Sequence, residues 1–165
     1  MRKVVIFGNS ASGKSTRAKQ LCAAEGLAHL DLDTLAWEPS KPPERRLLKA
    51  SQRDIEAFMA CNDAWVIEGC YADLIERAMP EATHALFLDL PVAACVDNAR
   101  RRPWEPHKYA SKQAQDENLN RLIEWIREYD DRTDTFSRAA HRALYDAFSG
   151  NKAVLTSNDM HISAF

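Results

Sequence analysis

Short apolar runs alternate with amphipathic segments along most of the chain. Five mostly apolar runs predict strands, at residues 3–7, 28–32, 64–67, 85–88 and 152–156. Between the strands, apolar positions recur at helical spacing, which predicts helices that include residues 16–25, 71–79, 116–129 and 137–149. Alternation of this kind is typical of an α/β fold, so we expect a three-layer architecture with a five-stranded parallel sheet flanked by helices.

Two stretches interrupt the alternation. Over about residues 34–62, several prolines break regular structure before a helix that we expect to open at a capping box, Ser51-x-x-Asp54. Over about residues 101–132, a polar loop follows a helix that ends in three arginines. Long loops in a compact domain are usually functional or mobile. We interpret the first stretch as a flap and the second as a lid, both within a single domain of residues 1–165.

A phosphate-binding motif follows the first strand. The loop reads Gly8-Asn9-Ser10-Ala11-Ser12-Gly13-Lys14-Ser15, followed by Thr16, and it fits G-x-x-x-x-G-K-[ST] at every fixed position. Its glycines allow main-chain N–H groups at a helix N-terminus to turn toward a polyanion. Lys14 adds positive charge near the β- and γ-phosphates, and the Ser15 hydroxyl is a ligand for Mg²⁺. The G-x-G-x-x-G fingerprint of Rossmann oxidoreductases is absent, because Ser10 holds its second glycine position.

Acidic residues follow two of the predicted strands. Asp31 and Asp33 lie at the end of the second strand, where alternation puts them on the same side of the chain. Ligands of open parallel sheets bind beyond the carboxyl ends of the strands, so both acids are expected near the phosphates. Glu68 follows the third strand and is either a group that holds Mg²⁺ through water or a plain carboxylate at a strand end.

Basic and amide side chains are candidates for nucleotide binding. The run Arg100-Arg101-Arg102 suits a solvated helix end, but it leads into the lid, and phosphoryl transfer calls for a movable arginine. Arg132 lies on the return from the lid and is expected to face the phosphates again. Asn158 follows the last strand, where an adenine could rest. His141, within a predicted helix, is expected to be structural.

Composition and charge limit the function classes. The formal charge of −2 argues against direct binding to nucleic acid or to an anionic membrane. Apolar runs are too short for a signal peptide or a membrane span, which predicts a cytoplasmic protein. The four cysteines are scattered without a C-x-x-C pair, so we expect neither a zinc site nor a disulfide framework.

Together the motifs resemble the small P-loop kinases of the adenylate kinase and shikimate kinase type, over nearly the whole chain. More closely, they resemble bacterial adenylate-kinase-related ATPases described as DNA topology modulation proteins. The stretches that carry this resemblance are 29–33 with Trp37-x-Pro39, 65–71 and 86–91. The Asp-Gly-Asn-Tyr element of those proteins is present here as Glu68-Gly69-Cys70-Tyr71.

The resemblance implies roles for the two acids of the second strand. Asp31-Leu32-Asp33 is similar to the D-x-D of shikimate kinases, in which the first acid attends Mg²⁺ and the second faces the acceptor hydroxyl. The glycine triplet of shikimate kinases and the Asp-Gly-Phe-Pro-Arg signature of adenylate kinases are both missing. Neither shikimate nor AMP is therefore expected as the acceptor. Trp37 in the flap is open to two interpretations, stacking on a substrate ring or local packing.

These observations predict an ATP-dependent phosphotransferase that acts on a small acceptor and uses Mg²⁺. Lys14, Asp33 and Arg101 are the expected catalytic residues. Nucleotide binding is expected from the loop and Thr16, with Arg100, Arg132 and Asn158, and metal binding from Ser15, Asp31 and Glu68. The alternatives are a nucleotide-binding regulator or slow ATPase that acts through a partner or on DNA topology, and a kinase fold used only for interactions.

Overall fold

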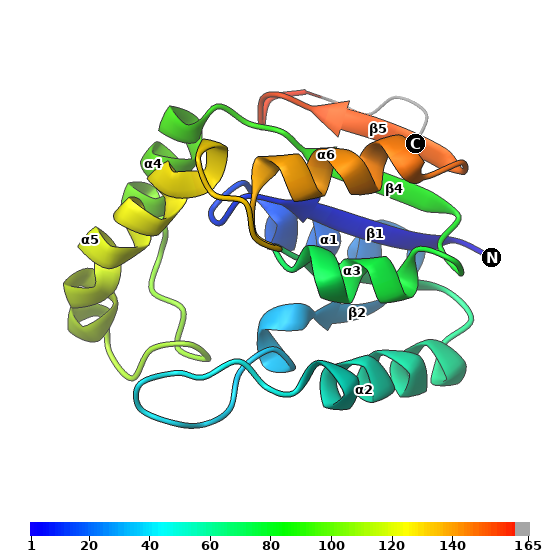
Figure 1. The fold of residues 1–165 in the computed structure, drawn as a ribbon, viewed down its shortest axis with the longest axis horizontal. Helices are drawn as coiled ribbons and strands as arrows, with labels where there is room; N and C mark the ends of the chain where they lie inside the picture. The colour runs from blue at the N-terminus through cyan, green and yellow to red at the C-terminus, as the bar shows by residue number, and fades with distance from the viewer. Residues whose placement is uncertain (161–165) are drawn as a thin grey trace.

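In the computed structural model, which describes residues 1–160, a five-stranded parallel sheet forms the centre of the molecule (Figure 1). The strand order is β2-β3-β1-β4-β5, and each neighbouring pair is parallel. The strands are β1 (Lys3–Gly8), β2 (Ala28–Asp31), β3 (Trp65–Gly69), β4 (His84–Leu88) and β5 (Asn151–Leu155). The predicted α/β fold class and all five predicted strands are confirmed.

Helices cover both faces of the sheet. They are α1 (Lys14–Glu25), α2 (Leu48–Cys61), α3 (Ala72–Ala78), α4 (Val92–Arg101), α5 (Lys112–Arg127) and α6 (Arg138–Ala147), with 3₁₀ turns at Leu32–Thr34 and Glu128–Asp130. Figure 1 shows α3 and α6 in front of the sheet and α1 behind it. This arrangement has the three layers expected from the sequence.

Alternation along β1 divides the core into two clusters. Val4 and Ile6 are fully buried with apolar residues of α1, α4 and α5, whereas Val5 and Phe7 are buried with those of α2, α3 and the end of α6. Successive side chains of a strand point to opposite faces, and both faces of this central strand are covered. The sequence of β1 is therefore a continuous apolar run. The loop that starts at residue 8 lies at the carboxyl end of this central strand.

The helix of the flap begins earlier than the sequence suggested. α2 starts at Leu48, so the prediction that Ser51-x-x-Asp54 opens it was wrong. Ser51 lies inside the helix, buried, and its hydroxyl donates to the main-chain oxygen of Leu35 at 2.8 Å. The hydroxyl is therefore hydrogen-bonded to Leu35, a residue distant in sequence, and does not cap the start of a helix as a capping box requires. Asp54 instead forms an ion pair with Arg46.

The lid helix also starts earlier than the predicted residue 116. α5 begins at Lys112, and the Ser111 hydroxyl caps it by accepting from the Ala114 N–H at 3.1 Å. The apolar stripe of this helix faces the core as expected, since Ile123 and Ile126 are buried. α5 is thus anchored against α4 and can hold the loop that precedes it.

His141 on α6 is a structural residue at the centre of the core. Its Nε2 lies 2.9 Å from the Cys70 carbonyl oxygen, and its Nδ1 lies 2.7 Å from the Tyr129 hydroxyl. A carbonyl only accepts, so Nε2 carries the hydrogen and Nδ1 accepts from the tyrosine. The neutral imidazole therefore links α6, the turn after α5 and the end of β3.

Acid is expected to destabilise the fold through this histidine. Burial lowers the pKa of His141 from 6.5 to about 4, so between these values the unfolded chain binds more protons than the folded one. The free energy of unfolding should fall as the pH falls across this range, by about 3 kcal/mol. Urea unfolding at several pH values tests this. His141→Gln keeps one donor and one acceptor and should make the unfolding free energy less dependent on pH. If both proteins lost the same unfolding free energy as the pH falls, His141 would not be the group responsible.

Candidate active site

The loop after β1 has the conformation that its glycines allow. Gly13 has φ 95° at the start of α1, and Gly8 has φ 153°. Ala11 also has a positive φ, 58°. The Asn9 side chain is buried: its amide donates to the Ile126 carbonyl oxygen at 3.1 Å, and its Oδ1 accepts from the Ser10 N–H at 2.8 Å. The end of α5 and the loop itself therefore hold this conformation in place.

Gly8 is expected to tolerate no side chain. A Cβ there would lie 2.5 Å from the Leu88 carbonyl oxygen, a main-chain atom of the neighbouring strand. Gly8→Ala should cost at least about 1–3 kcal/mol of unfolding free energy, measured by urea denaturation. Gly26→Ala is the matched control, because Gly26 also has a positive φ, 69°, but a Cβ there meets nothing within 4 Å. Equal losses in the two variants would contradict the steric argument.

Lys14 is folded back over its own loop. Its side chain is largely buried, and Nζ donates to the Asn9 carbonyl oxygen at 2.7 Å. An ammonium has three donors, so this contact leaves two for an anion. Lys14 also lines the cavity described below.

Three oxygen-bearing side chains meet beside Lys14. The Ser15 hydroxyl donates to Glu68 Oε1 at 2.7 Å, and Glu68 is almost fully buried. Asp31 on β2 is the register partner of Glu68 on β3. Burial, together with the charges of Glu68 and Asp33, raises the pKa of Asp31. Carboxylates gathered in this way repel one another, and a cation between them would relieve that repulsion.

This oxygen set fits a hard divalent cation such as Mg²⁺. Magnesium is typically held by one or two carboxylates, with phosphate oxygens and water completing its octahedral shell. Within residues 1–160, no three His, Cys, Asp or Glu side chains group as ligands for a metal ion. Ser15, Asp31 and Glu68 would therefore supply part of a shell whose remainder comes from a ligand.

Asp33, just before the flap, is contacted by one side chain of the lid and by one from the start of α3. Its Oδ1 accepts from the Tyr71 hydroxyl at 2.6 Å, and its Oδ2 accepts from Lys108 Nζ at 2.9 Å. Burial opposes ionisation of Asp33, but the Lys108 charge and the Tyr71 hydrogen bond outweigh it and lower the pKa of Asp33. The Lys108 ammonium loses solvation, yet the same contact raises its pKa. The two side chains are thus charged partners.

One large cavity joins these groups. It has a volume of about 960 Å³ and lies between the loop of residues 8–15, the acids at the strand ends and lid residues 103–109. The predicted site residues that line it are Ser10, Ala11, Gly13, Lys14, Ser15, Thr16, Asp31, Asp33, Glu68, Arg101 and Asn158. The other three loop residues, Gly8, Asn9 and Ser12, do not line the cavity, and the side chains of Asn9 and Ser12 are buried. The fold therefore brings most of the predicted site residues to one cavity.

Of the predicted arginines, Arg101 lines the cavity with its neighbour Arg102, which pairs with Glu105. Arg101 Nε donates to the Asp97 carbonyl oxygen at 3.3 Å, which leaves the rest of its guanidinium available. Arg100 lies outside the cavity lining, with its side chain half exposed and 3.8 Å from Asp97.

Arg132 also lies outside the cavity lining. It stacks 3.6 Å from the centre of the Trp125 ring and pairs with Asp134. This packing directs Arg132 to an aromatic cluster rather than to the phosphate-binding loop. Asn158, in contrast, is tied to that loop, because its Nδ2 donates to the Ser12 carbonyl oxygen at 2.9 Å.

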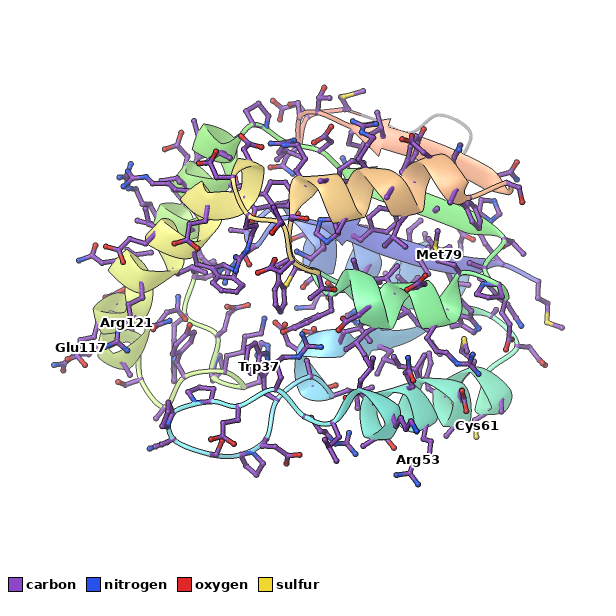
Figure 2. The ribbon with its side chains drawn as sticks, viewed as in Figure 1. Trp37, Arg53, Cys61, Met79, Glu117 and Arg121 are labelled. Atoms are coloured by element: carbon purple, nitrogen blue, oxygen red, sulfur yellow. The ribbon has the colours of Figure 1, made fainter. Side chains whose placement is uncertain are left out.

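Lys108 and Tyr71 are contacts of Asp33 that the motifs did not predict. Neither residue has a spacing signal, because the contacts join Asp33 to positions 75 and 38 residues away. Trp37 Nε1 donates to the Tyr71 hydroxyl oxygen at 2.7 Å, a contact that agrees with local packing, and stacking on a substrate ring stays the other interpretation. Figure 2 shows Trp37 near the centre of the view, whereas Arg53 and Glu117 point outward.

Comparisons with known proteins support the fold. No family model matches the chain, and no curated protein matches it. Among solved structures, it is similar to an unliganded sugar kinase from Janibacter sp. HTCC2649, with a TM-score of 0.54 and 15% sequence identity. The match covers 94% of this chain and 85% of the sugar kinase chain. At this identity the likeness shows the fold alone, a three-layer α/β arrangement shared with that sugar kinase, and the narrower resemblance to DNA topology modulation proteins stays an expectation.

Among residues 1–160, none of the helices combines the length and apolar character needed to cross a bilayer.

Proposed function

We propose that this protein is an ATP-dependent phosphotransferase that transfers the γ-phosphoryl group of ATP to a hydroxyl of a small acceptor. The observation that carries the proposal is one cavity whose lining includes Lys14 and Ser15, Asp33, and Arg101. Such a transfer needs three parts: groups that bind the phosphates, here Lys14 and Ser15; an acid that orients the acceptor hydroxyl, here Asp33; and a positively charged side chain near the transferred group, here Arg101.

The loop end of the cavity would hold the triphosphate. Main-chain N–H groups of the loop and the N-terminus of α1 favour an anion at this point. Lys14 has two donors left for the β- and γ-phosphate oxygens. Ser15, Asp31 and Glu68 would hold Mg²⁺, which would supply positive charge to neutralise the phosphates.

The Asp33 end would hold the acceptor. The acceptor oxygen forms a bond to the γ-phosphorus while the bond to the β–γ bridging oxygen breaks, and ADP leaves with that electron pair. Asp33 accepts a hydrogen bond from the hydroxyl and takes its proton, or passes it to water. Its lowered pKa keeps it ionised at neutral pH and so able to accept. Arg101 would neutralise charge on the transferred group.

The acceptor class can be narrowed by experiment. The solved structure described above is of a sugar kinase, so sugars, sugar acids and polyols are the first acceptors to test. Calorimetry with Mg-ATP measures nucleotide binding, and phosphorus NMR of the reaction mixture detects a phosphorylated acceptor directly. ADP and inorganic phosphate without such a product would favour the slow ATPase alternative. No heat with any nucleoside triphosphate would refute nucleotide binding altogether.

A further inference from the structure

Three side chains from separate segments form a hydrogen-bonded chain that ends on Asp33. Trp37 of the flap donates from Nε1 to the Tyr71 hydroxyl oxygen at 2.7 Å. The Tyr71 hydroxyl, just before α3, donates to Asp33 Oδ1 at 2.6 Å. Both donors have one hydrogen to give, so the direction of the chain is fixed from Trp37 to Tyr71 to Asp33. We call these three residues the Trp37–Tyr71–Asp33 relay.

Tyr71 is held rigidly and does not face the cavity. It is 2% exposed and is not among the residues that line the cavity. The Phe136 ring meets it edge-on at 5.4 Å between centroids, and the Arg45 guanidinium lies 5.1 Å from its ring centre. Aromatic packing of this kind fixes a ring in one orientation. Its hydroxyl is therefore aimed at Asp33 by the core and cannot touch a substrate itself.

The relay leaves the two oxygens of Asp33 unequal. The terminal torsion of an aspartate is broad, so a free carboxylate can present either oxygen. Here Tyr71 holds Oδ1 at the core side, and Oδ2 meets Lys108 from the lid at 2.9 Å. Lys108 also lies 3.9 Å from Asp31 and lines the cavity. The partner of Oδ1 thus comes from the core, whereas the partner of Oδ2 comes from a lid residue that lines the cavity.

We infer that Tyr71, oriented by Trp37, is a positioning residue that fixes Asp33 so that Oδ2 receives the acceptor hydroxyl in place of Lys108. This inference rests on the proposed function, because it assigns the acceptor to Asp33. It also gives Trp37 a defined role, because its N–H polarises the tyrosine hydroxyl and strengthens the hydrogen bond that Tyr71 donates. The lid lysine occupies the acceptor position until the acceptor displaces it.

Tyr71→Phe tests the inference with the smallest change. It removes one oxygen and leaves the ring that packs against Phe136 and Arg45. Trp37→Phe removes the first donor and should give a weaker effect in the same direction. Tyr145→Phe on α6 is the matched control, because it deletes a phenolic hydroxyl that lies outside the relay and the cavity lining.

The first readout needs no acceptor. The indole N–H resonance of Trp37, identified among four tryptophans by its loss in Trp37→Phe, reports the hydrogen bond to Tyr71. It should move upfield in Tyr71→Phe and stay in place in Tyr145→Phe. Asp33→Asn should shift the Trp37 indole N–H resonance when Tyr71 is present. In a protein that already carries Tyr71→Phe, the same substitution should leave this resonance where it is. Movement of equal size in both backgrounds would overturn the relay.

The second readout is transfer to whichever acceptor the wild-type protein phosphorylates. Tyr71→Phe should lower kcat by about 10- to 100-fold, because misplacing a reacting group has effects of this size. The KM for ATP and the calorimetric affinity for Mg-ATP should not change, whereas a general loss of structure would alter them. A kcat equal to that of Tyr145→Phe would overturn the inference. The proposed function is tested separately: it fails if the wild-type protein forms no phosphorylated product with any acceptor.

Discussion

Lys14→Ala is expected to abolish phosphoryl transfer and to weaken ATP binding. The ammonium lies within the loop of residues 8–15, donates one hydrogen bond to Asn9 and has two further donors, in a buried setting where charge is poorly screened. Losing a charge-assisted hydrogen bond of about 1.5–3 kcal/mol should weaken ATP binding by about 10- to 100-fold. Transfer should fall by a further 10²- to 10³-fold or so, because charge on the γ-phosphate grows as the bond breaks. Calorimetry and a coupled ADP assay measure the two effects.

Lys112→Ala is the matched control for this prediction. It removes the same charge from an exposed position on α5, where Lys112 pairs with Asp116. Surface ion pairs contribute little, so its affinity and turnover should match the wild-type protein. The melting temperature of Lys14→Ala should stay close to that of the wild-type protein, since folding loses one internal hydrogen bond. Wild-type turnover in Lys14→Ala would remove this residue from the mechanism.

Features that depend on nearby residues were predictable from the sequence. The loop conformation follows from glycines at fixed spacing, and the structure shows why position 8 needs one, since Leu88 occupies the space of a Cβ. Gly26 ends α1 with φ 69°, as its place after an amphipathic run suggested. The strands were predictable because both faces of the sheet are covered and buried strands read as apolar runs.

Contacts between distant segments were not predictable in this way. Tyr71 and Lys108 reach Asp33 from the start of α3 and from the lid, and no periodicity or motif spacing links the three positions. The tertiary fold determines such contacts, because parallel strands bring their carboxyl ends to one edge and the loops then meet there. The sequence therefore predicted that Asp33 lies near the loop, and it now lines the same cavity, but the sequence did not reveal the residues that contact it.

At two further positions the structure differs from the prediction because a tertiary partner binds the side chain. Ser51 was predicted to cap a helix, but its hydroxyl is used by Leu35 of the preceding loop. Arg132 was predicted to face the phosphates, yet the Trp125 ring and Asp134 hold it away from the cavity. In both cases a tertiary partner competes with the role that the local pattern favoured, and only the folded arrangement reveals that partner.

Asp33→Asn is expected to separate nucleotide binding from transfer. The substitution keeps the shape of the side chain and removes its charge, so an acceptor hydroxyl loses the group that orients and deprotonates it. Loss of a general base costs about 10²- to 10⁴-fold in rate, and kcat should fall by a factor in this range. Affinity for Mg-ATP should persist, because Lys14 and the loop are untouched. Calorimetry and phosphorus NMR measure the two quantities on the same preparation.

Asp63→Asn, at an exposed position between α2 and β3, makes the same change in charge away from the cavity and should behave as the wild-type protein. Asp33→Asn also removes the nearer of the two core carboxylates beside Lys108, at 2.9 Å, and leaves Asp31 at 3.9 Å, so the ion pairing between lid and core is weakened. A lid that opens more readily would speed the exchange of nucleotide, whereas loss of the acceptor contact slows the chemical step. A burst experiment separates these effects, since only the second lowers the rate of the first turnover. An unchanged first turnover would show that Asp33 serves the lid and not the acceptor.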